Sequence, residues 1–336
     1  MADMTSGNTV PDRYVVVIGG MNMDICGRPT STVVDRDSNP GVVSMSAGGV
    51  GQNIAQNMAH LGMPTYLITV YGDDENGKTL ERFPCEAQQH QSLTTDPHSS
   101  EGRRFFPPYM FHHRRYGRSC WCRQRHGNLQ GNQSGSSSNL ASTSSTVPPS
   151  ACLTPILNRK PWHGIGEHVT APLFGDTVST VKAHRFDTIL NKMTVLKPND
   201  LEASVLTGIG IADQYSAGAA AKTLLDRGVK NVFISLGANG ILCARHENDE
   251  YSFKHVPPYR TEIATANGAG DAGMAAITWS FFDNPDRDLE EVGKIAQAAS
   301  SIALECTKAV PDITVERIRK KMSGEIEPLL DEVRTA

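Results

Sequence analysis

The chain has 336 residues, and 32 lysines and arginines against 36 aspartates and glutamates give it a formal net charge of −4 at pH 7. This balance offers no general attraction for nucleic acid or for an anionic membrane, so neither is expected as a partner. The sequence shows no 18-residue apolar run and no signal peptide, which favours a cytoplasmic protein. Residues 14–327 are long enough for one large domain, with flexible tails at 1–12 and 328–336.

The seven cysteines form an odd set without the spacing of a disulfide framework, so free thiols are expected. Cys120 and Cys122 lie near His112 and His113 in the sequence. Their one-residue spacing is not the two-residue spacing of zinc knuckles. The sequence therefore predicts no zinc site.

The first predicted strand is the continuous apolar run at 14–18, which ends in two glycines as a buried parallel strand does. Asn22 and Asp24 follow at its C-terminal end, where ligands of open α/β sheets bind. Asp24 could instead be a turn residue at the strand exit. Residues 27–47 are polar with short β-branched runs, which favours a small ribbon over a core element.

The next element is a predicted helix, because apolar residues recur at helical spacing at positions 50, 54, 58 and 61. Gly48 and Gly49 form its entrance and Gly62 its end. Asn53 lies in its first turn. On position alone, Asn53 could be a helix cap or a solvent-facing residue.

After another predicted strand at 65–70, residues 72–79 match the G-x-x-x-x-G-K-[ST] pattern of a phosphate-binding loop. The match is misleading, because Asp73, Asp74 and Glu75 would face a polyphosphate. Like charges about 4 Å apart cost on the order of 1 to 4 kcal/mol per pair in wet surroundings. We therefore expect no nucleotide at this loop.

Residues 83–170 lack hydrophobic periodicity, and they hold seven of the eleven histidines and four of the seven cysteines. Within them, 132–150 is a Ser/Thr/Pro-rich run that should be disordered. A basic stretch at 103–126 could suggest a nucleic-acid module, but no stable element is predicted to present it. A long functional insertion would leave the middle strands of the sheet recognisable on either side of the inserted residues, and these middle strands are not found.

Recognisable secondary-structure patterns resume at 173–176, which is predicted to be the end of a strand. Lys182 follows Asp176 by six residues. A second strand runs to Leu196 and leads through Lys197 and Pro198 into Asn199. A helix is predicted at 200–206, so Asn199 and Glu202 both lie near its entrance. The Asn-x-x-Glu spacing also suits a plain capping box. Asp176 and Lys182 could be an ordinary exposed pair.

Further strands and helices follow, with a glycine-containing turn after the predicted buried strand at 232–234. Ser235, Gly237 and Gly240 lie in that turn. A hairpin is predicted at 240–255, and amphipathic helices at 292–304 and 313–322. The region 298–301 is a candidate wall for an aromatic base.

The glycine-rich turn at 265–274 runs into an apolar helical stretch and carries one acidic residue, Asp271, at the junction. Gly268 and Gly270 can take backbone angles that a Cβ forbids, so the amides of 268–271 can converge on an anion at a helix N-terminus. A carboxylate there would be repelled by a phosphate unless it accepts a proton from an attacking hydroxyl. Asp271 is therefore the candidate base. Alternatively, Asp271 only caps its helix.

Two motifs carry a family resemblance. Residues 267–272, Asn-Gly-Ala-Gly-Asp-Ala, resemble the C-terminal signature of the ribokinase-like (PfkB) carbohydrate and nucleoside kinases, and 48–55 resemble the N-terminal one. The sequences at 22–25, 176–183 and 196–203 are most similar to those of the pseudouridine kinase branch of this family. The resemblance covers roughly 14–82 and 171–325, whereas 83–170 do not match.

The resemblance implies an α/β, ribokinase-like three-layer sandwich with a central, mostly parallel sheet and a small β lid. Residues 27–47 would be the first part of the lid, and the mismatch at 83–170 would leave the lid and the middle strands incomplete. The implied cofactors are ATP and Mg²⁺, with a monovalent cation as a further candidate. A small-molecule sugar or nucleoside is the implied substrate, and a homodimer through the lid is a candidate assembly.

The resemblance also assigns roles. Asp271 would be the catalytic base, and the amides of Gly268, Ala269 and Gly270 would stabilise charge in the transition state. Asn199 and Glu202 would organise Mg²⁺ through water. The residues implied for the acceptor are Asn22, Asp24, Gly48, Gly49, Asn53, Asp176 and Lys182. Those implied for the nucleotide are Asn199, Ser235, Gly237, Gly240 and Asn267.

The expected function is ATP-dependent phosphorylation of a sugar hydroxyl, with pseudouridine as the preferred acceptor and its 5'-phosphate as the product. A kinase for ribose or for another sugar or nucleoside is the alternative within the family. A protein that keeps the fold and has lost the chemistry is the competing class, because 83–170 do not match.

We expect 83–170 to be translated out of frame or from wrongly spliced sequence, since the flanking motifs keep plausible separations. Gly273 stands where the family usually has Phe, which predicts a loose site and a high acceptor KM that Gly273→Phe would lower.

Overall fold

The structure is a computed structural model that describes residues 13–70, 72, 74–80, 110–115, 118–123, 150–154, 159–308 and 310–325. The described residues form a ten-stranded sheet and a separate two-stranded ribbon. In spatial order the strands of the large sheet are β12 (Glu250–Val256), β11 (Ile241–Glu247), β10 (Asn231–Ser235), β9 (Met193–Lys197), β8 (Leu173–Asp176), β7 (Ser150–Leu153), β1 (Val15–Ile18), β4 (Thr65–Ile68), β5 (Met110–Arg115) and β6 (Arg118–Arg123). From β10 through β5 every neighbouring pair is parallel, and antiparallel pairs close both ends.

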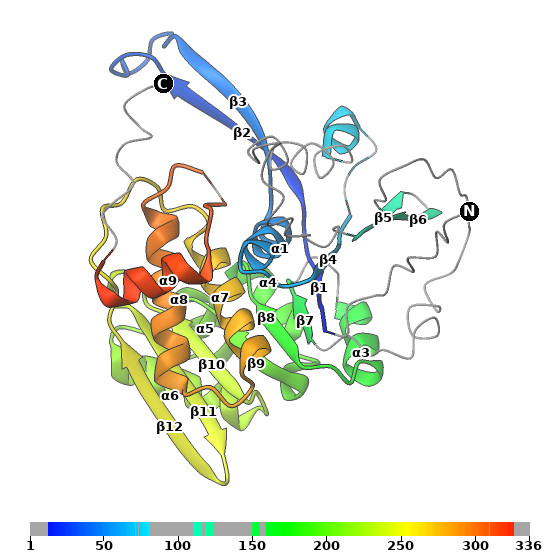
Figure 1. The fold of residues 1–336 in the computed structure, drawn as a ribbon, viewed down its shortest axis with the longest axis vertical. Helices are drawn as coiled ribbons and strands as arrows, with labels where there is room; N and C mark the ends of the chain where they lie inside the picture. The colour runs from blue at the N-terminus through cyan, green and yellow to red at the C-terminus, as the bar shows by residue number, and fades with distance from the viewer. Residues whose placement is uncertain are drawn as a thin grey trace, which may run out of the picture.

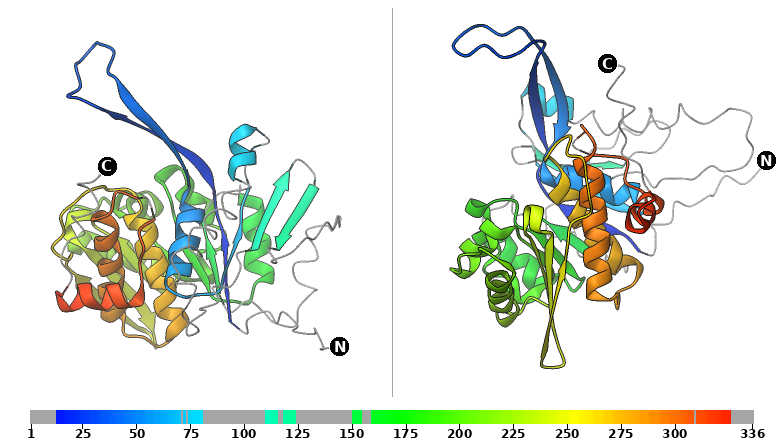
Figure 2. Two further views of the ribbon diagram at one scale, coloured as in Figure 1. Left: turned by 45° about the horizontal axis from the view of Figure 1, so that its top comes forward. Right: turned by 90° about the vertical axis from the view of Figure 1, so that its left-hand side faces the viewer.

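Helices cover both faces of this sheet (Figures 1 and 2). One face carries α1 (Val50–His60), α7 (Ala269–Asp283), α8 (Leu289–Leu304) and α9 (Val315–Ser323). The other carries α3 (Arg159–His168), α4 (Thr180–Ala183), α5 (Asp200–Thr207) and α6 (Gln214–Asp226). Short 3₁₀ turns lie at His184–Phe186, Leu190–Lys192 and Gly237–Asn239, and 75–80 are helical.

The layers follow from the period of two in the strands. In β10, Phe233 faces the core under α7 and α8, whereas Val232 and Ile234 face the core under α6. A strand buried on both sides needs apolar residues at every position, which is why these runs are continuous rather than alternating. The predicted three-layer α/β sandwich with a mostly parallel sheet is confirmed.

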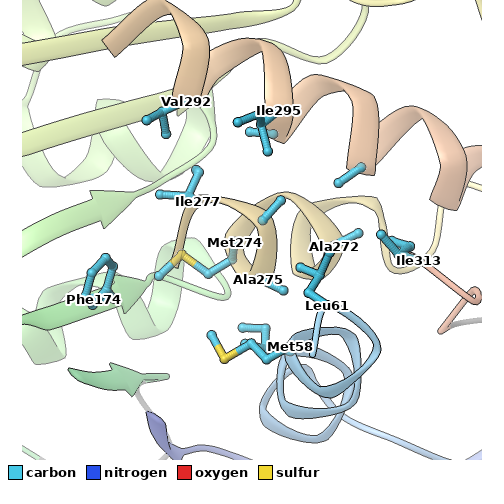
Figure 3. Close-up of a cluster of buried hydrophobic side chains, with 14 of the residues drawn as sticks. Met58, Leu61, Phe174, Ala272, Met274, Ala275, Ile277, Val292, Ile295 and Ile313 are labelled. Atoms are coloured by element: carbon cyan, nitrogen blue, oxygen red, sulfur yellow. The ribbon is translucent and has the colours of Figure 1, made fainter. Parts of the chain in front are cut away.

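The helix α7 lies in the middle of one layer, between α1 and α8 (Figure 3). Its side chains are small or apolar on nearly all sides, and residues 272–278 are all buried. A helix of this composition is stable only when other elements enclose it. This packing fixes the position of its N-terminus, where Asp271 lies.

The ribbon consists of β2 (Asn22–Pro29) and β3 (Gly41–Gly48), which pair antiparallel and project away from the large sheet (Figure 1). It contains the predicted ribbon at 27–47 and extends it at its base to Asn22 and Gly48. Its apolar residues Ile25, Val42, Val43 and Met45 are all more than half exposed.

The structure differs from the expectation for 83–170 wherever it describes that segment, because β5, β6, β7 and α3 all lie there. Ser150–Leu153 form β7, a fully buried strand between β1 and β8. Four residues are too few to show a period, and the Ser/Thr/Pro-rich run directly before them hides the signal. This middle strand of the sheet is therefore present, and so are β5 and β6. The stretches 81–109, 116–117, 124–149 and 155–158, which hold most of the predicted aberrant segment, lie outside the described residues.

Candidate active site

The N-terminus of α7 is the place where the sequence predicts an anion site. Gly268 is the N-cap residue, with φ of 80° in the left-handed region that glycine favours. The first intrahelical hydrogen bond runs from the Ala272 amide to the Gly268 carbonyl (2.9 Å). The amides of 269–271 therefore have no helical acceptor and are free to bind an anion.

Asp271 lies in the first turn of this helix, and Asn53 of α1 donates from Nδ2 to its Oδ2 (2.7 Å). Burial, and after it the nearby Asp176 carboxylate, raise the pKa of Asp271 to about 7, although the Asn53 hydrogen bond and Lys197 lower it. A carboxylate with this pKa can accept a proton near neutral pH. The contact holds the Asp271 carboxylate in place, in addition to the contact predicted between Asn53 and the acceptor.

Lys197 lies beside the first turn of α7, and the sequence interpretation did not single it out as a candidate. It ends β9, directly beside Asp176 at the end of β8, and the Nζ–Oδ2 distance is 3.0 Å. Both residues are buried, at 5% and 6% exposure. Burial alone would lower the pKa of Lys197, but the carboxylates of Asp176, Glu202 and Asp271 outweigh it and raise that pKa. A charged residue at the last position of an otherwise apolar strand was the available signal.

Asn22 and Asp24 lie at the base of the ribbon and explain the adjacent glycines. Asn22 donates to Asp24 (2.6 Å). A Cβ on Gly48 would lie 2.0 Å from Asp24 Oδ2, and one on Gly49 would lie 2.5 Å from Asn22 Oδ1. The two glycines thus leave room for polar side chains beside the entrance of α1.

Asn199 and Glu202 form a capping box at the start of α5, with Glu202 N donating to Asn199 Oδ1 (2.8 Å) and Asn199 N donating to Glu202 Oε2 (3.0 Å). Thr177 also donates to Glu202 Oε2. The capping alternative is therefore present in the structure. Glu202 Oε1 has no hydrogen bond to any described residue and remains available.

The side chains of Asn199 and Glu202 are of the type that fits Mg²⁺. The described residues contain no group of three or more acidic, histidine or cysteine side chains that could enclose a metal. Mg²⁺ keeps several waters and is held by one or two carboxylates together with substrate phosphates. The free oxygen of Glu202 matches that mode of binding.

The remaining predicted residues lie around the same sheet edge. Lys182 is half-buried on α4, and the partner of Asp176 is Lys197 instead. Ser235 bonds the Pro198 carbonyl through its amide (3.0 Å). Gly240 has φ of 85°, and a Cβ there would lie 2.1 Å from the Val256 carbonyl oxygen, so this glycine is required by packing of the hairpin. Asn267 is exposed in the loop before α7.

The misleading phosphate-loop pattern proves to be the start of a helix at 75–80. Its Gly77 amide donates to Asp74 Oδ1 (2.8 Å), and Lys78 pairs with Glu75. The Gly77 amide and the Lys78 ammonium, two of the groups with which such a loop would bind phosphate, therefore both contact carboxylates.

The expectation for Gly273 requires correction. Gly273 faces α8 rather than the acceptor, and a Cβ there would lie 2.7 Å from Ser300 Oγ. The Ser300 hydroxyl donates to the Ala269 carbonyl (2.9 Å). The missing side chain lets the two helices approach, and a larger residue would push them apart.

Comparison with known proteins extends this picture. Pseudouridine kinase of Escherichia coli (strain K12) is 27% identical over 316 residues, covering 91% of this chain and 95% of that protein. Mouse ribokinase is 34% identical over 109 residues, 32% of this chain and 33% of that protein.

Solved structures show the same fold. A ribokinase from Thermotoga maritima superposes with a TM-score of 0.62 at 18% identity, covering 93% of this chain and 99% of that one. A ribokinase of Arabidopsis thaliana complexed with ribose and ATP gives a TM-score of 0.62 at 20% identity, covering 92% and 98%. No described helix is long and apolar enough to span a membrane.

The model of the pfkB family carbohydrate kinases matches residues 12–83 and 162–315, so the unmatched stretch falls within the segment that lacks a pattern. The matched residues are well over half of the chain and include the ribbon, Asp271 and Glu202. The chain belongs to the pfkB family of carbohydrate kinases.

Proposed function

We propose that this protein transfers the γ-phosphoryl group of ATP to a sugar hydroxyl of a nucleoside, with pseudouridine as the preferred acceptor and its 5'-phosphate as the product. The observation that carries the proposal is the position of Asp271. It is a carboxylate with a pKa of about 7 in the first turn of a helix whose amides 269–271 are free.

The chemistry follows from this geometry. The hydroxyl oxygen forms a bond to the γ-phosphorus while the bond to the β–γ bridging oxygen breaks, and ADP leaves with that electron pair. Asp271 accepts the hydroxyl proton. The amides of Gly268, Ala269 and Gly270 were predicted to stabilise the developing charge. The helix geometry favours the amides of 269–271 for this role, because these three amides have no acceptor within the helix and lie at its N-terminus.

The remaining residues of the proposed site would bind the nucleotide and its metal ion. Asn199, Ser235, Gly237, Gly240 and Asn267 would surround the nucleotide. Mg²⁺, bound through water to Glu202, would neutralise charge on the phosphates of ATP.

The acceptor would lie between Asp271 and the base of the ribbon. Asn22 and Asp24 present polar groups there, and both are exposed. The pseudouridine assignment is supported by the similarity to the Escherichia coli enzyme over 91% of this chain. Ribose is the second candidate, because mouse ribokinase matches at 34% identity over a third of the chain.

The exposed apolar residues of the ribbon support the further proposal that two copies associate through the lid. Ile25, Val42, Val43 and Met45 would be covered in such a dimer. Sedimentation of the full chain would test it, and a monomer at micromolar concentration would contradict it.

The test of function is a phosphorylation screen of the full chain with ATP over pseudouridine, uridine, adenosine and ribose. We expect kcat/KM to be highest for pseudouridine, with Asp271→Asn as the inactive control. A higher value for ribose would move the assignment to the second candidate. No transfer to any acceptor would favour the competing class, a fold without the chemistry.

A further inference from the structure

The site contains a buried cation to which none of the roles above gives a task. Lys197 is 5% exposed, and its ammonium pairs with Asp176 Oδ2 at 3.0 Å. An ammonium has three N–H donors. Asp176 takes one, and no other hydrogen bond of this ammonium reaches a residue that the structure describes. Buried donors left unsatisfied are unfavourable, so a ligand that accepts from them would be bound tightly.

The Lys197 ammonium lies beside the helix N-terminus at which a phosphoryl group would bind. A methyl group placed on Gly270 would lie 3.7 Å from Lys197 Nζ, so the cation is beside the first turn of α7. It also acts electrostatically on the carboxylate of Asp271. A positive charge next to free helix amides and a base is an arrangement suited to a phosphoryl group that is being transferred.

Asp176 is held in place by a strained turn. Its Oδ1 accepts from the Val178 amide (2.9 Å), and the Ser179 amide bonds the Thr177 carbonyl (2.7 Å), which closes a three-residue γ-turn. Val178 has φ of 64°, a region that β-branched residues rarely adopt. Such strain persists where the surroundings require it and is common at functional sites. Here the turn fixes Oδ2 of Asp176 toward Lys197.

We propose that Lys197 is a further catalytic residue, whose ammonium donates hydrogen bonds to the phosphoryl oxygens during transfer, and that Asp176 is the positioning residue that holds it. This inference rests on the proposed function. Lys197 stays protonated throughout, because the bond changes are those between the acceptor oxygen, the γ-phosphorus and ADP, and the proton goes to Asp271. The cation also offsets the repulsion between the Asp271 carboxylate and the anionic phosphoryl group.

The experiment separates the loss of a catalytic hydrogen-bond donor from the destabilisation caused by an unpaired buried charge. Lys197→Met alone leaves Asp176 buried without a partner, and this variant can fail to fold. The double variant Lys197→Met/Asp176→Asn removes both charges and keeps similar volumes, so it should recover the melting temperature that the single variant loses. We expect its kcat to fall on the order of 10² to 10³-fold, as when a preorganised donor to the transition state is removed. A fall of less than thirtyfold would overturn the proposal.

A matched control is the other buried lysine–carboxylate pair, Lys321 with Glu305. Lys321→Met/Glu305→Gln removes the same two charge types at similar burial. Its kcat should stay within threefold of the wild type. A loss as large as that of the Lys197 double variant would show that any buried pair has this effect, and the proposal would fail.

Calorimetric binding of ADP with aluminium fluoride, which mimics the transferred group, makes the two proposals separable. The Lys197 double variant should bind this complex at least tenfold more weakly, with the affinity for ADP alone changed less than threefold. If the wild type phosphorylates no acceptor but this tenfold difference is found, the proposed function fails and the role of Lys197 stands. If the wild type is active and the variant keeps both kcat and the complex, the role of Lys197 fails and the function stands.

Discussion

Two buried lysine–carboxylate pairs occupy different regions of this molecule. Lys197 and Asp176 lie at the C-terminal ends of two neighbouring parallel strands, β9 and β8, beside α7. Lys321 of α9 pairs with Glu305 after the end of α8, and its ammonium also donates to the Arg260 carbonyl (3.3 Å). The residue types and the burial are alike, at 5% exposure for Lys197 and 7% for Lys321.

The difference lies in what surrounds each ammonium. Lys321 connects α9 to the loop before α7 and to the end of α8, so its donors are directed at protein groups. Lys197 faces free helix amides and a carboxylate that burial has made basic. A buried ion pair is by itself weak support for stability or for function. The groups around the pair indicate which of the two it serves.

The largest effect is expected when the proposed base, Asp271, is replaced. Asp271→Asn keeps the size of the side chain and eliminates the proton acceptor, so we expect kcat to fall by about 10³-fold or more, with ATP affinity nearly unchanged. Steady-state rates and equilibrium binding of ATP measure the two effects. More than about a tenth of the wild-type activity would exclude Asp271 as the base and leave Lys197 beside an inert helix end.

How far the sequence predicts this structure depends on the range of each signal. The glycines at 268 and 270, the acidic residue after them and the apolar helix form one local pattern, so the start of α7 with Asp271 in its first turn could be predicted. The Lys197–Asp176 pair could not, because it depends on β8 and β9 being neighbours in register. Gly273 was misinterpreted for a similar reason, since its tight contact is with Ser300 of another helix.

The strands show the same limit. β9 and β10 could be predicted from their continuous apolar runs. β7 could not, because its four residues are recognisable only by their burial between β1 and β8. The roles predicted for Asn22, Asp24 and Lys182 stay predictions, since they depend on a bound acceptor.

Lys321→Met sharpens the comparison from the structural side. It leaves Glu305 buried without a partner, so we expect the free energy of unfolding to fall by about 3 to 5 kcal/mol. Chemical denaturation measures this loss. The fraction that remains folded should turn over within threefold of the wild type. An unchanged denaturation midpoint would mean that the pair does not hold α9 in place.

The pH dependence of stability tests whether Asp271 is as perturbed as its surroundings imply. Its pKa of about 7 in the folded protein is above the ordinary 3.8, so the folded state binds more protons than the unfolded one. The free energy of unfolding should therefore fall as pH rises from about 4 to about 7, by roughly 2 to 4 kcal/mol after allowance for partial exposure. Asp271→Asn should lack this fall and be the more stable protein at pH 8. Parallel pH curves for the two proteins would contradict the shift.

Gly273 tests the opposite side of α7, which carries packing rather than chemistry. Gly273→Ala places a Cβ 2.7 Å from Ser300 Oγ and should destabilise the protein by about 1 to 3 kcal/mol, and Gly273→Phe by more. Gly218→Ala in α6 is the matched control, because a Cβ there meets nothing within 4 Å. That control should be stabilising by about 0.5 to 1 kcal/mol. Equal effects at both glycines, or a lower acceptor KM in Gly273→Phe, would restore the earlier interpretation.

The smallest effect is expected at Lys78, a lysine that matches a phosphate-binding motif but lies in a region without the properties of the Lys197 site. Its ammonium pairs with Glu75, both side chains are largely exposed, and Asp74 occupies the loop amide of Gly77. An exposed pair of this kind contributes about 0 to 1 kcal/mol. Lys78→Ala should therefore change the affinity for ATP less than threefold, measured by calorimetry on protein whose fold is verified by circular dichroism. Loss of ATP binding with the fold intact would assign the nucleotide to this loop, and the cation beside α7 would then need another explanation.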